Sequence, residues 1–190
     1  RGFYKLLYSR FRLPIRVYHL IAAIKTILIL NYKSKIDVLQ AWNPLAGLAA
    51  TLAGKIIRKP VFIDFTDFYS DIAKTDSNKI VVWFFQKIER FILKNAKRVF
   101  VVSEIMKQRL ANEGINVNKI KIVEDGADKE IFNPEIDGQE IRKRFGIKKN
   151  NPVIIHHGDI KYADGTDILF YAFKKVLNQI PETKLLILGG

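Results

Sequence analysis

The stretch RVFVVSEIMKQRLANEGINVNKIKIVED (residues 98–125) contains two short runs of mostly β-branched residues with a helical segment between them. Ser103 stands where a helix N-cap is expected, because a serine hydroxyl accepts a hydrogen bond from a free backbone N–H. Gly114 stands where the helix should end, because glycine accepts left-handed backbone angles. The stretch therefore predicts a strand, a helix and a second strand, the repeating unit of a parallel sheet.

The same alternation extends in both directions along the chain, so the predicted fold class is α/β with a mainly parallel sheet. The polar residues 134–151 contain Pro134 and Gly138 and lack a β run, which places a domain boundary near residue 150. We therefore expect one domain over residues 1–150 and a second over residues 151–190. Further strands are expected at 35–42, 60–65, 152–158 and 184–190, and further helices at 15–31, 43–57, 78–96 and 167–180.

Charge and composition narrow the classes of partner. The formal net charge is +13, from 32 Lys+Arg against 19 Asp+Glu, which favours a polyanion: nucleic acid, an anionic membrane surface or a phosphorylated substrate. No RRM, KH or helix-turn-helix signature supports a nucleic-acid partner, so none is expected. The chain has no cysteine, which excludes disulfides and thiolate metal sites.

The basic charge is concentrated in residues 1–36, which contain no acid and many aromatic and aliphatic residues. Their longest uncharged run is far short of the roughly 20 apolar residues that a bilayer span needs. No small-residue cleavage site of a signal peptide follows it. Two readings stay open: an amphipathic helix on a membrane surface, or a half-buried helix with a solvated edge. The chain begins with Arg1, so we expect its natural start to be missing.

Common catalytic motifs are absent. The sequence contains no GxGxxG, Walker loop, HExxH or GxSxG pattern. His19, His156 and His157 are the only histidines, too few and too scattered for a metal site. His156 and His157 end a strand and should point to opposite sides of the sheet, so one of them can face a ligand crevice. No metal is therefore expected.

Candidate site residues follow the ends of predicted strands, where α/β sheets bind their ligands. Asp67 follows the strand at 60–65 and can orient a substrate hydroxyl or accept its proton, or else cap a turn. Gly126 permits a tight turn, and Asp128 can cap the segment after that turn. Gly158 follows VIIHH, where a missing side chain lets a ligand approach the backbone. The helix that begins near Thr166 then offers free N–H groups to a phosphate.

Three segments, residues 37–57, 89–134 and 152–190, together resemble the retaining glycosyltransferases of family 4, which have the two-lobed GT-B fold. The resemblance covers roughly residues 35–190. The family pattern is matched in order by Ser103, Gly114, Asp125-Gly126-Ala127-Asp128, Phe132, Pro134, Gly158-Asp159-Ile160, Asp164-Gly165, Asp167 and residues 185–190.

The resemblance implies a Rossmann-like parallel sheet of one GT-B lobe plus the first β-α-β unit of a second lobe. It implies transfer of a sugar from a nucleotide-sugar donor to a lipid or glycan acceptor, with retention of configuration and without a cofactor or an obligatory metal. A cytoplasmic protein of cell-envelope glycan biosynthesis, peripheral on the inner face of the membrane through residues 1–36, fits this picture. Thr66 and Asp67 are the catalytic candidates. The donor-binding candidates are Gly126, Asp128, Gly158, Asp159, Asp164 and Gly165.

The sequence also departs from the family. Asp159 and Asp164 occupy the positions of the Arg and Lys that hold the donor diphosphate, and two anions there disfavour a diphosphate unless Lys161 or backbone N–H groups compensate. Thr66-Asp67 stands where the family has His-Asp. The chain stops at Gly190, before the acid-x7-acid element that contacts the donor sugar. We therefore expect an enzyme fragment that is inactive alone, or alternatively a non-catalytic GT-B-like scaffold or partner subunit.

Overall fold

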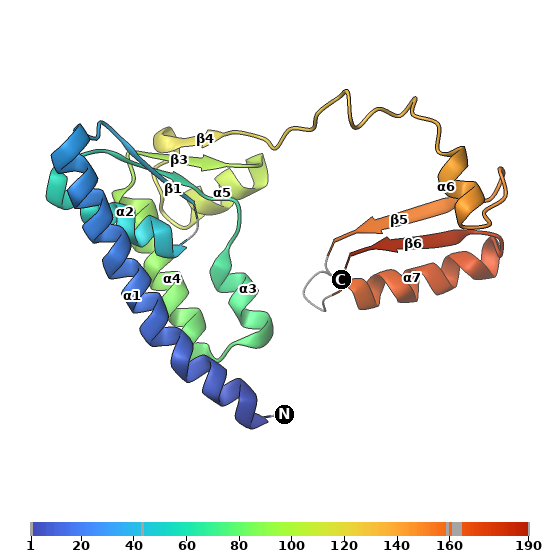
Figure 1. Ribbon diagram of the computed structural model, residues 1–190, viewed down its shortest axis with the longest axis horizontal. Coiled ribbons are helices and arrows are strands. Elements are labelled where there is room, and N and C mark those ends of the chain that lie inside the picture. The colour runs from blue at the N-terminus through green and yellow to red at the C-terminus, as the bar shows by residue number, and fades with distance from the viewer. Residues whose placement is uncertain (1, 43, 159, 161–164, 190) are drawn as a thin grey trace. The chain divides into compact units, whose positions relative to one another are not determined.

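The computed structural model describes residues 2–42, 44–158, 160 and 165–189, with the backbone alone for residues 2–16 and 76 (Figure 1). The chain divides into two compact units, one ending at Gly126 and one beginning at Ala127. The predicted domain boundary near residue 150 stays a prediction.

The first unit is built on a four-stranded sheet in the order β1-β2-β3-β4, with every pair parallel. The register places Trp42 beside Asp64 and Asp64 beside Phe100, so the carboxyl ends of the strands meet at one edge. Because loops at this edge lead into helices, the side chains that follow each strand converge there. The strands are β1 (Leu39–Trp42), β2 (Val61–Asp64), β3 (Arg98–Val101) and β4 (Ile120–Ile122).

Helices flank this sheet. In sequence they are α1 (Gly2–Ser34), α2 (Pro44–Ile57), α3 (Tyr69–Asp76), α4 (Lys79–Asn95), α5 (Glu104–Asn112) and the short 3-10 helix η1 (Val117–Lys119). α1 packs along α2, and α4 packs against both α2 and α3 (Figure 1). The core lies between the sheet and these helices, where Ile63, Ile92, Val99 and Leu110 are each 0% exposed.

The second unit contains α6 (Gln139–Arg144), β5 (Val153–His157), α7 (Thr166–Gln179) and β6 (Lys184–Leu188). β5 and β6 are parallel, with Val153 opposite Lys184 and His157 opposite Leu188. Their side chains are intermediate or exposed, and in the described part of the unit only Ile147, Thr166 and Thr183 are buried. A two-stranded sheet has two unpaired edges and buries little apolar area.

These elements confirm the predicted α/β fold with a parallel sheet. The local caps are also confirmed: Ser103 Oγ accepts a hydrogen bond from the Met106 N–H at 3.3 Å, and Gly114 has φ +82°. Some bounds differ from the prediction. α1 starts at Gly2 because only Pro14 interrupts the helix-forming residues before 15, and the helix continues through it.

The strand expected at 119–125 contains only Ile120–Ile122, and its first residue follows directly on η1. The segment after β2, where no helix was predicted, contains the helix α3. Its N-cap residue, Phe68, has no side-chain cap. The missing acceptor comes from α4, where Glu89 Oε1 accepts a hydrogen bond from the Ser70 N–H at 2.9 Å. A cap supplied from another helix leaves no local sequence signal.

Candidate functional site

Thr66 and Asp67 meet Trp42 at the carboxyl edge of the first sheet. Trp42 ends β1, and its indole Nε1–H donates a hydrogen bond to Thr66 Oγ1 at 2.8 Å. Thr66 Oγ1 in turn donates to Asp67 Oδ2 at 3.2 Å. The threonine hydroxyl is thus oriented by one donor and one acceptor, and it holds the exposed Asp67 carboxylate toward solvent.

Sequence reasoning missed Trp42, although it ends a strand at the edge where ligands bind. This three-residue chain can accept a hydrogen bond or a proton from a substrate hydroxyl at Asp67. Beside it, burial raises the pKa of the Tyr69 phenol, and the negative charge of Asp67 raises it further. Tyr69 therefore stays protonated at neutral pH and can act as a hydrogen-bond donor.

Gly126 and Asp128 lie in exposed chain after β4. Asp128 Oδ1 accepts a hydrogen bond from the Glu130 N–H at 2.9 Å, and the Asp128 carbonyl accepts one from the Phe132 N–H at 2.8 Å. Asp128 therefore closes a local turn, as expected for a capping aspartate. A Cβ on Gly126 would meet no atom within 4 Å. Their predicted contact with a donor stays a prediction.

In the second unit, glycines end both strands. Gly158 has φ +146° and Gly189 has φ +151°, and the Gly158 N–H donates to the Leu188 carbonyl at 3.0 Å. A Cβ on Gly189 would overlap the Gly158 carbonyl oxygen, so the two backbones require glycine at this contact. Gly165, with φ +70°, precedes the first turn of α7 and supplies no side-chain cap.

A Cβ on Gly158 would meet no atom within 4 Å, and the start of α7, which carries the partial positive charge of a helix N-terminus, follows Gly158 in sequence. Asp159 and Asp164, the expected anions of this site, lie outside the described residues. His156 is half-buried and its Nε2 is buried without a partner in the described structure, whereas His157 is exposed. This difference agrees with the expectation that the two rings face opposite sides of β5.

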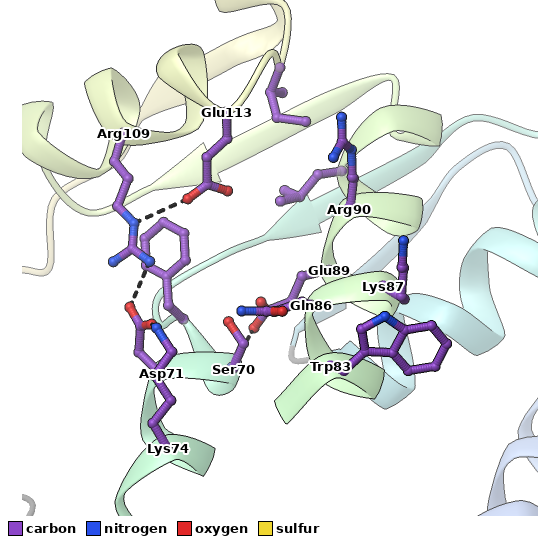
Figure 2. Close-up of a pocket in the computed structure, with 13 residues that line it drawn as sticks. Ser70, Asp71, Lys74, Trp83, Gln86, Lys87, Glu89, Arg90, Arg109 and Glu113 are labelled. Carbon is purple, nitrogen blue, oxygen red and sulfur yellow. Dashed lines mark hydrogen bonds and ion pairs between the residues drawn. The ribbon is translucent and has the colours of Figure 1, made fainter. Parts of the chain in front are cut away.

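The structure adds a pocket in the first unit, with a volume of about 470 Å³, between α3, α4 and the carboxyl-terminal part of α5 (Figure 2). On one side Arg109 joins two acids, with its Nη2 at 2.6 Å from Asp71 Oδ2 and its Nε at 3.2 Å from Glu113 Oε1. The same guanidinium lies 3.4 Å from the centroid of the Phe68 ring. Phe68 directly follows Asp67, so the pocket adjoins the sheet edge.

The ion pairs set the charge states on this side of the pocket. Burial by itself raises the pKa of Asp71, but hydrogen bonds and charge from Lys74 and Arg109 outweigh it and hold that pKa below its ordinary value. Burial lowers the pKa of Arg109, and its bonds to Asp71 and Glu113 reverse the shift and raise it. Asp71 and Arg109 are therefore both charged at neutral pH.

Glu89 forms the floor of the pocket from α4, with Ser70 beside it in Figure 2. The side chain is only 5% exposed. Burial raises the pKa of this carboxyl, and hydrogen bonds from Ser70 oppose that shift. Its contact with the Ser70 N–H makes it the cap of α3, so it positions the residues that follow Asp67.

The opposite wall is a face of α4. Trp83, Lys87 and Arg90 all line the pocket, and Lys87 Nζ lies 5.6 Å from the centroid of the Trp83 ring (Figure 2). Among the described residues, no group of three or more His, Cys, Asp or Glu is placed to hold a metal ion. Within the same part of the chain, no helix combines the length and apolar character needed to cross a membrane.

Known proteins resemble this chain both in sequence and in structure. A family model described as Glycosyltransferase Family 4 matches residues 1–131. Sulfoquinovosyl transferase SQD2 of Arabidopsis thaliana is 25% identical over 158 residues, which are 82% of this chain and 30% of that protein.

Two solved structures show the same fold. Anabaena HepE, in complex with UDP and glucose, matches with a TM-score of 0.66 and 19% identity over 87% of this chain and 42% of that chain. Sucrose-phosphate synthase from Thermosynechococcus elongatus matches with a TM-score of 0.65 and 17% identity over 88% of this chain and 40% of that one. The chain therefore spans less than half the length of these three relatives.

Proposed function

This chain belongs to glycosyltransferase family 4 and has the GT-B type of fold, and on that premise we propose that it is part of a transferase. The enzyme would move a sugar from a nucleotide-sugar donor to a lipid-linked or glycan acceptor, with retention of configuration. The observation that carries the proposal is Gly158 at the end of β5, with φ +146°, followed in sequence by the start of α7, where Gly165 supplies no side-chain cap. UDP, the nucleotide held by HepE, is the first donor nucleotide to test.

The donor half of the proposal rests on backbone groups. Gly158 leaves space for a ligand at the end of β5, and the partial positive charge at the start of α7 favours an anion without a cationic side chain. Asp159 and Asp164 replace the two cations with which the family holds the diphosphate. Backbone N–H groups can hold a diphosphate in their place. We keep Gly126, Asp128 and Gly165 as further donor-site residues.

The acceptor half rests on the edge of the first sheet. Asp67 is exposed and oriented through Thr66 by the Trp42 indole, so its carboxylate can accept a hydrogen bond from the attacking hydroxyl of the acceptor. That hydrogen bond orients the oxygen that forms the new glycosidic bond. We propose Asp67 as a catalytic residue, and Thr66 as the residue that takes the place of the family's imidazole.

Membrane association is proposed on the exposed surface of α1, in a protein on the cytoplasmic side of the membrane. The described part of this helix combines exposed apolar side chains with Lys25 and Lys33 and carries no acid, as expected of a helix on an anionic bilayer. The exposed apolar residues are Val17, Tyr18, Ile21, Ile29, Leu30 and Tyr32. Failure of the chain to sediment with anionic vesicles at low salt would refute this association.

The test of the proposed function is donor binding by the natural full-length protein. We expect UDP and UDP-glucose to bind in calorimetry. Substitution of Gly158 by valine should weaken that binding at least about tenfold, because its side chain would occupy the strand end. The same substitution of Gly146, which also has a positive φ (+63°) and where a Cβ meets nothing within 4 Å, is the matched control. Absence of binding to UDP-, GDP- and ADP-sugars alike would favour the scaffold alternative that Asp159, Asp164 and Thr66 suggest.

A further inference from the structure

The α4 wall of the pocket carries two positive charges that form no ion pair with the described residues. Trp83, Lys87 and Arg90 follow one another at spacings of four and three residues, which places them on one face of the helix. In the described structure neither Lys87 nor Arg90 takes part in an ion pair, although both line the pocket. Lys87 Nζ lies over the Trp83 ring, 5.6 Å from its centroid.

The acids of the same pocket are already engaged. Asp71 is bound by Arg109 and Lys74, and Glu113 is bound by Arg109. Glu89 Oε1 accepts a hydrogen bond from the Ser70 N–H in α3. The groups that remain available to a ligand are therefore the cations and the indole of α4, which Figure 2 shows across the pocket from Arg109 and Asp71.

The combination of an aromatic face and two free cations fits a specific chemistry. An indole, here 57% exposed, packs against the apolar C–H face of a sugar ring, and Lys and Arg bind phosphate oxygens. The volume of about 470 Å³ lies in the range of small-molecule sites. We propose that this face of α4 binds the acceptor through a phosphoryl group attached to a sugar or polyol ring.

This inference rests on the proposed function, since it names the class of acceptor that reaches Asp67. Phe68, the residue after Asp67, lines the same pocket as Trp83. A phospholipid headgroup and a free sugar phosphate share this chemistry. A titration with both kinds of ligand distinguishes the two sources.

The 190-residue chain is titrated at low ionic strength with glucose 6-phosphate, glucose, inorganic phosphate and vesicles with and without phosphatidylinositol. We expect glucose 6-phosphate, or the phosphatidylinositol vesicles in its place, to bind at least about tenfold more tightly than glucose, phosphate or plain vesicles. The sequence has two tryptophans, so the indole N–H signals in NMR report separately on Trp83 and Trp42. The Trp83 signal should shift more than the Trp42 signal, because Trp42 senses the acceptor only through the hydrogen bonds of Thr66 and Asp67.

Variants test the assignment. Lys87→Gln with Arg90→Gln should weaken binding at least about tenfold, whereas Lys94→Gln should change it less than about twofold. Lys94 is an exposed cation of the same helix that does not line the pocket, so it is the matched control. Trp83→Leu should remove the preference for glucose 6-phosphate over inorganic phosphate. All of these positions are exposed, so the variants should keep the fold, as circular dichroism will show.

Equal losses in the Lys94 control and the double variant would mean general charge attraction and would overturn the inference. So would displacement of glucose 6-phosphate by UDP, because the phosphate would then occupy the donor site. Absence of binding in both the soluble and the vesicle arm would also overturn it. UDP binding by the full-length protein is measured separately, so failure of the donor proposal is told apart from failure of the α4 site.

Discussion

The two units of this chain are built from the same strand-helix alternation, yet they bury very different amounts of side chain. In the first unit Ile63 in β2 and Val99 in β3 are 0% exposed. In the second unit Ile155 in β5 is 60% exposed and Leu188 in β6 is 50% exposed. A strand pattern in the sequence therefore specifies the local backbone conformation. The burial of the strand's side chains depends on how many other strands and helices pack against it.

The largest expected effect tests that difference directly. Ile92→Ala should destabilise the first unit by about 2–5 kcal/mol, because it empties a fully buried site, whereas Ile155→Ala in the second unit should cost less than about 1 kcal/mol. Urea unfolding followed by amide exchange measures both units in one sample. We also expect weaker amide protection in β5 and β6 than in β2 and β3. Strong protection of residues 152–190 would contradict the comparison.

A smaller effect concerns the cap that one helix supplies to another. Glu89→Ala should destabilise the first unit by about 1–3 kcal/mol, because the Ser70 N–H, in a residue that is 4% exposed, loses its acceptor. Glu89→Gln keeps a carbonyl oxygen at that position and should cost much less. Thermal unfolding of both variants measures this difference, and equal losses would show that the hydrogen bond is not what matters.

The stability that the Glu89 carboxyl contributes should change with pH in a defined direction. The pKa of Glu89 is raised in the folded state, so the folded protein binds this proton more tightly than the unfolded chain does. Its contribution to stability is fully present below the ordinary glutamate pKa and is lost as the pH rises through the raised pKa. Glu89→Gln should remove this part of the pH profile of unfolding, with Glu104→Gln, an exposed acid on α5, as the control.

The smallest expected effect concerns the ion pair on the other side of the pocket. Asp71→Asn should cost about 0.2–1 kcal/mol, since the side chains of Asp71 and Arg109 are 35% and 43% exposed and solvent screens the pair. The pKa of Asp71 is lowered in the folded state, so its contribution is present above the ordinary aspartate pKa and is lost as the pH falls through the lowered one. Denaturation at pH 7 and at pH 3 checks the sign. A larger loss at the lower pH would contradict it.

Capping residues in the sequence predicted correctly where a helix begins and ends. Ser103 and Gly114 bracket α5 as expected, because a serine cap and a left-handed glycine act on residues within one turn. The candidate residues after each strand were found by position alone. Thr66 and Asp67 do lie together at the carboxyl edge of the sheet, whereas their catalytic role remains a proposal.

The residues that sequence reasoning missed are joined across the chain. Trp42 is bound to Thr66 over 24 positions, and the Ser70 N–H is bound to Glu89 over 19 positions. No periodicity links such pairs, because their distance depends on the register of the strands and the packing of the helices. Trp83, Lys87 and Arg90 have a helical spacing in the sequence. Only the structure shows that they line a pocket together with Arg109 and Asp71.

The sequence by itself determined the α/β class, the parallel alternation and the resemblance to family 4, because each depends on residue types at short, ordered spacings. The tertiary structure alone decided the α3 helix, the orientation of Thr66 by Trp42, the glycine contact between Gly158 and Gly189, and the pocket beside α4. The physical reason is that hydrogen bonds and buried contacts between distant residues form only when the sheet and its helices bring those residues together.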